Sequence, residues 1–380
     1  MISGAGEWWK KTMSQLVEES KGLPHVPPAV VEEYLRQSPR MAEAVSRSFG
    51  QRDDLGLLIG SAPVSMMHDN HRHHGAFMAD VFLLRATTLL VNMMPWVYRA
   101  YSGQGFAYEY FRVELEAWRT VIAETLGQEQ AREIVAYYDW LLDKHDDVIR
   151  LAEAATPWTP ELPGAWQSVY EEFLECLLTA DSPRCIAIGR EAVGGLEPGP
   201  FYLHVVQPAL YTVGEMWAEG KVTVAQEHLA STLTARTLAS LFVDGIYVPK
   251  VRGKVLVTAS PNEFHEIGAW MVSSCLEYDG WNVLYLGANT PHEALIRMAR
   301  AEQPDIIAIS MTTPFNFRSI YQLIQDVRAM PELAECRIMV GGQAFGWDES
   351  IAEAMGADAY TQDCIQAVEC ARRWWREGEQ

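Results

Sequence analysis

Cysteine and long apolar runs are both scarce in this sequence. No cysteine precedes Cys176, and none of the six has the two-residue spacing of a CxxC pair, which speaks against a disulfide scaffold and a structural zinc site. No apolar run approaches the ~20 residues that a membrane span needs. The amino terminus, MISGAGEWWKK, lacks the apolar core of a signal peptide. We therefore expect a cytoplasmic protein that makes no membrane contact.

Positive charge is also scarce. Thirty basic residues stand against 50 acidic ones, for a formal net charge of −20, which argues against direct binding to nucleic acid. The composition, 49% hydrophobic and 21% charged, excludes a disordered chain, and 380 residues suggest two or three domains. The 13 Trp, 15 Tyr and 12 Phe are compatible with a large flat ligand and equally with large cores and interfaces.

The first 155 residues predict an all-helical domain. One stretch, 106–126, carries an apolar stripe at helical spacing, and a second stretch runs from 129 to 154. Gly127 separates them in the manner of a helix C-cap, so the two helices should form an antiparallel pair. The stripe of the first helix consists of Phe111, Leu115, Trp118, Ile122 and Leu126.

Three prolines follow between residues 155 and 164, so we place a linker at 156–164. Residues 165–247 predict four helices of bundle length. The expected helices are Trp166–Ala180, Pro183–Gly194, Tyr202–Ala218 and Val224–Val243.

The last segment, 248–380, changes character. Four short apolar runs alternate with helical patterns, which is typical of a parallel, doubly wound sheet. Ligands of such sheets bind beyond the carboxyl ends of the strands. The expected strands are 255–259, 282–286, 305–309 and 337–341, and the expected helices are 266–279, 291–302 and 316–328.

Polar and glycine residues lie where these strands end. Glu263 stands two residues before His265, a spacing at which the carboxylate can fix the imidazole tautomer and raise its basicity. Alone, the pair could equally be surface decoration. Its context is a set of residues at the other strand ends: Gly268, Leu286, Ser310, Thr312, Gly341 and Gly342.

This set resembles the cobalamin-binding domain of corrinoid methyltransferases and mutases. The resemblance implies a flavodoxin-like, Rossmann-type domain with a five-stranded parallel sheet. It implies that His265 is a metal ligand, binding cobalt from below in place of the cofactor's dimethylbenzimidazole, and that Glu263 holds that histidine. Most members have Asp where this chain has Glu263. Residues implied to line the slot for the displaced nucleotide tail are Ser310, Thr312, Gly341 and Gly342.

The preceding four-helix bundle resembles the cap that covers the upper face of the corrin. Its Trp-x9-Glu-His spacing resembles the light-sensing cobalamin domains of bacterial photoreceptor regulators. By that resemblance Trp217 packs over the adenosyl group of adenosylcobalamin, Glu227 and His228 flank it, and Val224 lies nearby. Those regulators usually have His directly after the Trp, where this chain has Ala218, so a two-His lit adduct through that position is excluded. The sixth ligand after photolysis is then His228 or water.

Four histidines fall within seven residues at 68–74. They could bind a transition metal, hold a tetrapyrrole, or form a solvated polar turn. The paired helices around Gly127 resemble the last two helices of a globin-like sensor, yet no His lies between His74 and His145, which argues against haem ligated in the usual way. An open-chain bilin, bound without a thiol, suits this domain better. The candidate contacts are His68, His73, Arg85, Trp96, Tyr110, Tyr137, Trp140 and His145.

The order of globin-like domain, helical cap and cobalamin domain resembles the photocobilins, which use cobalamin and biliverdin together. The resemblance implies a non-enzymatic light sensor in which photolysis of the Co–C bond changes conformation or oligomeric state. Expected partners are further copies of the chain and an unidentified downstream effector protein. The alternatives are a corrinoid carrier protein of a methyltransferase system and a globin-like stress sensor regulated by its cobalamin domain.

Overall fold

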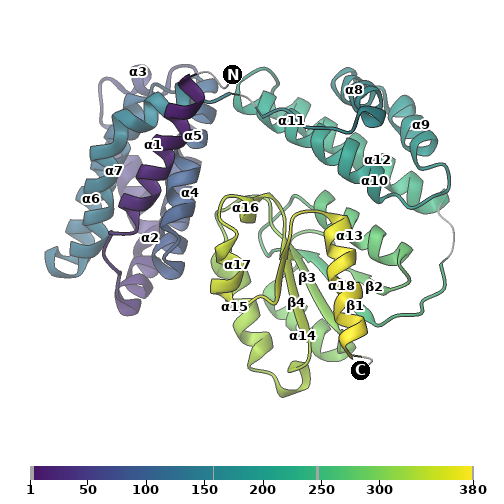
Figure 1. The fold of residues 1–380 in the computed structure, drawn as a ribbon. Helices are drawn as coiled ribbons and strands as arrows, with labels where there is room; N and C mark the ends of the chain where they lie inside the picture. The colour runs from purple at the N-terminus through teal and green to yellow at the C-terminus, as the bar shows by residue number, and fades with distance from the viewer. Residues whose placement is uncertain (1–3, 157, 245–247, 379–380) are drawn as a thin grey trace. The chain divides into compact units, whose positions relative to one another are not determined.

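The computed structural model describes residues 4–156, 158–244 and 248–378 (Figure 1). The contacts divide the chain into two compact units. Unit 1 comprises Met1–Pro157 with Ala218–Lys221, and unit 2 comprises Trp158–Trp217 with Val222–Gln380. The boundaries that we expect near 156 and 247 touch residues 157 and 245–247, which lie outside the described residues. No helix of the described chain is long and apolar enough to cross a membrane.

Unit 1 is all-helical, as the periodicity predicts. The expected antiparallel pair is present as α6 and α7, which pack along each other. Gly127 joins them with φ 80° and ψ 152°, so it provides a positive φ but not the left-handed helical cap that we expected. The helices of this unit are α1 Gly4–Ser20, α2 Pro28–Gly50, α3 Leu55–Ile59, α4 Val64–Leu84, α5 Thr87–Gly103, α6 Glu109–Leu126 and α7 Gln128–Ala154.

The apolar stripes of unit 1 meet in one aromatic-rich core. Trp118 and Tyr138 are fully buried between helices, and Tyr98 stacks on Phe111 with ring centroids 3.9 Å apart. Much of the aromatic excess of the sequence is therefore used in packing, where rings contribute large buried areas.

The helical bundle of unit 2 forms where the four helical patterns lie. The third expected helix is interrupted, because a π-helical turn, Tyr202–Val206, separates a short helix from the longer one that ends at Ala218. α12 packs against α8 and α9. The elements are α8 Gly164–Thr179, α9 Ser182–Val193, α10 Gly199–Phe201, α11 Gln207–Ala218 and α12 Val224–Asp244.

The rest of unit 2 is a five-stranded parallel sheet in the order β2-β1-β3-β4-β5, with helices on both faces (Figure 1). The expected parallel, doubly wound, flavodoxin-like domain is confirmed, and β5 is the strand that the apolar runs did not reveal. The strands are β1 Lys254–Ala259, β2 Asn282–Tyr285, β3 Ile306–Ser310, β4 Arg337–Gly341 and β5 Ala359–Thr361. The helices are α13 Ile267–Tyr278, α14 His292–Glu302, α15 Phe317–Arg328, α16 Gln343–Gly346, α17 Ser350–Met355 and α18 Cys364–Gly378.

The bundle and the sheet of unit 2 share one apolar core. α12 contacts α13, and residues of both layers, among them Tyr202 and Cys275, belong to the same buried cluster. The strands register so that the ends of β1 and β3 meet, with Ala259 opposite Ser310. The loops that follow these strands therefore converge at one edge of the sheet.

Candidate cobalamin site

The loop after β1 positions Glu263 and His265. The imidazole Nδ1 of His265 lies 2.5 Å from Oε1 of Glu263, and the same carboxylate oxygen accepts the backbone N–H of His265 at 3.0 Å. The hydrogen bond to Glu263 raises the pKa of His265, with a further contribution from the negative charge of Glu227 on α12. With Nδ1 engaged, Nε2 is the ring nitrogen available to a metal ion.

The other oxygen of Glu263 is held by the loop after β3. Oε2 accepts the backbone N–H groups of Thr312 and Thr313 at 2.9 and 3.0 Å and the Thr313 hydroxyl at 3.1 Å. Burial by itself raises the pKa of Glu263, but the hydrogen bonds from His265 and Thr313 outweigh it and lower the pKa to about 2. The carboxylate, 3% exposed, is therefore a fixed anion, whereas the His265 side chain is 53% exposed.

Glycines shape the remaining strand ends. Gly342, after β4, has φ 97°, and a Cβ there would lie 2.3 Å from the carbonyl oxygen of Met311. A Cβ on Gly341 would lie 2.7 Å from the carbonyl oxygen of Thr361, and one on Gly268 would lie 3.3 Å from Oγ of Ser310. No larger residue fits at 341 or 342 without moving the backbone. The structure thus brings Gly268 and Ser310 together, while Leu286 follows β2 beside them.

Trp217 lies in the last turn of α11, and the Glu227–His228 pair lies in the first turn of α12. Oε2 of Glu227 lies 2.6 Å from Nδ1 of His228, and its Oε1 accepts the hydroxyl of Ser231 at 3.0 Å. The side chain of His228 is 75% exposed and Val224 is also exposed, so both are accessible to a ligand. Ala218, by contrast, is fully buried.

The histidine-rich segment 68–74 lies within helix α4, so the polar turn is wrong. His71 points inward, with Nδ1 2.8 Å from Oγ of Ser46 and Nε2 3.1 Å from the hydroxyl of Tyr110. His74 Nε2 lies 3.0 Å from the hydroxyl of Tyr138. Successive residues of a helix face different directions, and the described residues contain no cluster of three metal-ligating side chains. The transition-metal alternative therefore finds no site in this part of the chain.

A buried polar network extends from His71. The amide of Asn70 donates to the hydroxyl of Tyr110 at 2.9 Å and to Oε1 of Glu114 at 3.0 Å. Burial raises the pKa of Glu114 to about 8 and lowers the pKa of His71 to about 3, so both are neutral near pH 7. An uncharged network of this kind is compatible with the interior of a helical domain.

The candidate bilin contacts differ in burial and in hydrogen-bond partners. Tyr137 donates its hydroxyl to the carbonyl oxygen of Pro24 at 3.1 Å, and the ring of buried His145 accepts or donates through Nδ1 to the hydroxyl of Tyr98 at 2.9 Å. Arg85 is exposed, at the left-handed C-cap of α4. His68 and His73 share α4, Trp96 lies on α5, and Trp140 lies on α7.

Two side chains that take part in these hydrogen-bond networks were not predicted from the sequence. Thr313, which donates twice to Glu263, is not among the residues predicted from the sequence, although it directly follows Thr312 in the loop after β3. Glu114 lies in the apolar stripe of α6, where a lone acid could have signalled a buried polar partner.

Comparison with known proteins identifies both layers of unit 2. Residues 253–368 and residues 169–241 each match a model described as a B12 binding domain. The chain is 29% identical over 191 residues to the HTH-type transcriptional repressor CarH of Myxococcus xanthus, covering 50% of this chain and 62% of that repressor.

A second relative is the dimethylamine corrinoid protein of Methanosarcina barkeri, 24% identical over 212 residues, covering 54% of this chain and 97% of that protein. The solved structure of the Methanosarcina barkeri monomethylamine corrinoid protein aligns with a TM-score of 0.48 and 15% identity over 55% of this chain and 98% of that chain. By the two matched models, unit 2 carries B12 binding domains, and its sequence is similar to an HTH-type transcriptional repressor and to a corrinoid protein.

The residues at the sheet edge fit cobalamin. The donor set offers one imidazole that is 53% exposed and whose Nδ1 is committed to a carboxylate, which leaves Nε2 for a metal ion. His265 would hold the cobalt, and Ser310, Thr312, Gly341 and Gly342 would line the path of the nucleotide tail.

Proposed function

We propose that this protein is a light sensor that binds adenosylcobalamin between the helical bundle and the sheet of unit 2. The observation that carries the proposal is the presence of two acid–histidine pairs: Glu263–His265 at the sheet edge and Glu227–His228 at the start of α12. The negative charge of Glu227 also contributes to the raised pKa of His265. The cofactor supplies a cobalt–carbon bond that visible light breaks. The chain supplies orientation and readout.

Each side chain has a definite part in this proposal. Glu263 keeps His265 in one tautomer and orientation, because both of its oxygens are fixed. Trp217, Glu227 and His228 would hold the adenosyl group. A packed interior does not keep a void, so the helices that carry these side chains would rearrange when that contact is lost.

The test is dark reconstitution with adenosylcobalamin, followed by absorption spectra and size-exclusion chromatography before and after green light. We expect a cobalamin spectral change together with a shifted elution volume. The matched variants are Trp217→Ala and Trp8→Ala, the second removing an exposed ring on α1 of unit 1. Only the first should abolish the elution shift. Unchanged spectrum and elution in the wild-type protein would refute the sensor.

The corrinoid carrier remains the second candidate, because a dimethylamine corrinoid protein is matched along 97% of its length. The two candidates differ in what the upper face accepts. A carrier takes methyl groups from a donor in the dark, whereas the sensor needs adenosine and light. Methylation of bound cob(I)alamin by a methylamine donor with its methyltransferase, with no photolysis of the adenosyl form, would decide for the carrier.

We further propose that the globin-like unit 1 binds biliverdin without a covalent link. Support comes from two buried ring nitrogens that have no hydrogen-bond partner within the described residues: Nε1 of Trp140 and Nε2 of His145. Buried polar atoms are normally satisfied, so such atoms suit a polar ligand. A red absorption band on adding biliverdin, weakened in Trp140→Phe and kept in Trp166→Phe, is expected. Absence of the band would refute bilin binding without touching the cobalamin proposal.

We also propose that the chain itself catalyses no reaction. Its proposed partners are further copies of the chain and a separate effector protein, and it is not proposed to bind nucleic acid or a membrane. It also places the protein in the cytoplasm, where its six cysteines, all free in the structure, stay reduced.

A further inference from the structure

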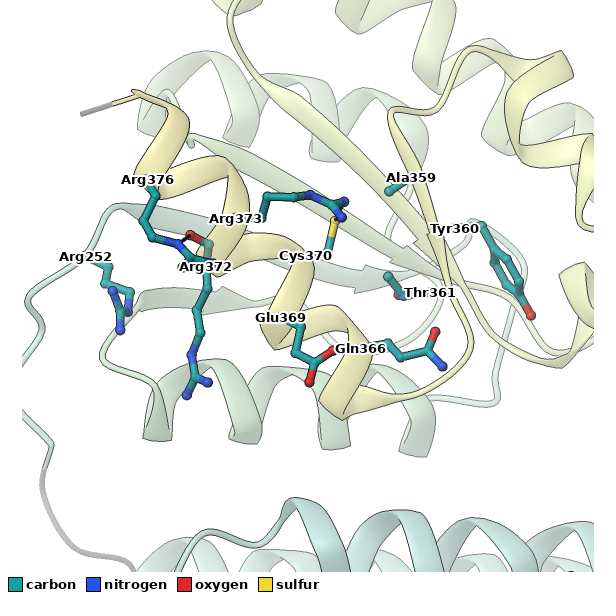
Figure 2. A pocket seen from close by; sticks show the side chains of 10 residues that line it. All are labelled: Arg252, Ala359, Tyr360, Thr361, Gln366, Glu369, Cys370, Arg372, Arg373 and Arg376. Atoms are coloured by element: carbon teal, nitrogen blue, oxygen red, sulfur yellow. Dashed lines mark hydrogen bonds between the residues drawn. The ribbon is translucent and has the colours of Figure 1, made fainter. Parts of the chain in front are cut away.

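A hollow lined by four arginines lies along α18. Its volume is about 740 Å³, and Figure 2 shows guanidinium groups from the last turns of α18 and from the segment before β1 along its lining. The end of β5 and the first half of α18 add polar groups, among them Thr361 and Gln366. The four arginines are Arg252, Arg372, Arg373 and Arg376.

Two of these arginines are held in place by one buried carboxylate. Nη2 of Arg372 lies 2.6 Å from Oδ1 of Asp279, and Nε of Arg252 lies 3.0 Å from Oδ2 of the same residue. The indole N–H of Trp281 donates to that carboxylate at 3.1 Å. A single carboxylate, 4% exposed, thus serves two guanidinium groups.

The other two arginines are exposed and are held only by neutral acceptors. Arg373 donates to Sγ of Cys370 at 3.3 Å, and Arg376 donates to the carbonyl oxygen of Arg372 at 3.3 Å. Each guanidinium has five N–H donors, so most of them remain available. Glu369 is the one acid among the lining residues. The hollow is therefore positive, in a chain whose formal net charge is −20.

The lining selects the kind of occupant. Small-molecule pockets are mostly apolar with a few polar groups, whereas here charged and polar side chains dominate the lining. Guanidinium forks pair with carboxylates in bidentate geometry. A long polyanion such as nucleic acid would meet the repulsion of the whole acidic chain, whereas a short segment with a few carboxylates meets much less of it.

We propose that the hollow along α18 docks an acidic segment of a partner protein, whose carboxylates pair with Arg373 and Arg376 while Asp279 keeps Arg252 and Arg372 in position. The surface is complete within unit 2 and does not depend on cobalamin or light. This inference therefore stands apart from the proposed sensor and fails or succeeds independently of it.

The test uses the full chain and fluorescence anisotropy of a short labelled peptide rich in aspartate and glutamate, at low ionic strength. The Arg373→Gln/Arg376→Gln double variant should bind roughly five- to tenfold more weakly, as expected from the loss of two exposed ion pairs. Raising the salt concentration should weaken peptide binding by the wild-type protein and reduce the difference in affinity between it and the double variant. Arg373→Lys/Arg376→Lys, which keeps the charge, should recover part of the loss.

The matched control is Arg40→Gln/Arg297→Gln, which removes the same charge from exposed positions outside the hollow. Equal weakening by this control would overturn the proposal, since bulk charge would then explain the binding. So would equal binding of a matched peptide with Asn and Gln, competition by inorganic phosphate at the peptide's own concentration, or tighter binding of a short RNA. Unchanged thermal unfolding of the variants verifies that each is folded.

Discussion

Histidines and glutamates occur in both units, but in opposite surroundings. In unit 2, Glu263 is a buried anion that presents a half-exposed His265 at the edge of a sheet. In unit 1, Glu114 and His71 are sealed in a helical core and are neutral near pH 7. The first arrangement offers a side chain to a ligand, whereas the second satisfies its own members. The same residue types thus become a ligand site or an internal network depending on which layer of the fold they occupy.

The strongest test of this contrast is His265→Ala. If His265 is presented to a ligand, its removal should weaken cobalamin binding by more than the ~10–100-fold typical of an outer-shell partner. Titration of cobalamin into the full chain, followed by absorbance, measures the effect. The control is His292→Ala, which removes a surface imidazole paired with Asp326. Equal binding by His265→Ala and the wild-type protein would exclude the imidazole as the cobalt ligand.

The next effect concerns the carboxylate behind His265. Glu263→Gln keeps the size but replaces the anion, and we expect cobalamin affinity to fall roughly 10–100-fold. Glu293→Gln, an exposed change on α14, is the matched control and should leave the affinity unchanged. If both variants lowered the cobalamin affinity equally, the cause would be the change in net charge and not the loss of the hydrogen bond to Nδ1 of His265.

For unit 1 the prediction concerns stability against pH. The pKa of Glu114 is raised from 4.5 to about 8, so its contribution to stability is fully present below about pH 4.5 and is lost as the pH rises through about 8, because between these values only the folded state keeps the proton. Over this window Glu114→Gln should gain stability relative to the wild-type protein, by up to about 1.4 kcal/mol per pH unit. Hydrogen exchange of α6 peptides in the full chain measures it.

Comparison of each variant with the wild-type protein at the same pH cancels the opposite contribution of His71, whose lowered pKa removes stability as the pH falls below about 6.5. Glu116→Gln, an exposed change on the same helix, should show no pH-dependent difference. A flat difference for Glu114→Gln would show that the carboxyl group is not buried as described.

The smallest expected effect is that of Thr313→Val. Oε2 of Glu263 keeps both backbone donors and loses only the hydroxyl, so cobalamin affinity should fall about fivefold, as for one hydrogen bond. Thr179→Val, on the exposed face of α8, is the control. If Thr313→Val lowered the cobalamin affinity as much as Glu263→Gln does, the Thr313 hydroxyl would be the main group that fixes the carboxylate.

The sequence was more informative about unit 2 than about unit 1, for a physical reason. Parallel strands place their carboxyl ends at one edge, so residues 263, 310 and 341 could be grouped from the apolar runs alone. The two hydrogen bonds from Thr313 to Glu263 depend on the direction of the backbone in the loop after β3, which the sequence does not specify. In unit 1 helical spacing predicted the stripes, but pairing of His71 with Tyr110 joins different helices, which no local pattern specifies.

The five-residue π-turn at Tyr202–Val206 has a consequence for the chain downstream. A π-turn holds one residue more than an α-helical turn, so it offsets the helix after it by about 100° around its axis. Trp217 lies in the last turn of that helix. Deleting one residue within 202–206 would restore a regular helix and swing the indole to another side of the bundle. The direction in which Trp217 points around the helix axis thus depends on the π-turn about three turns before it.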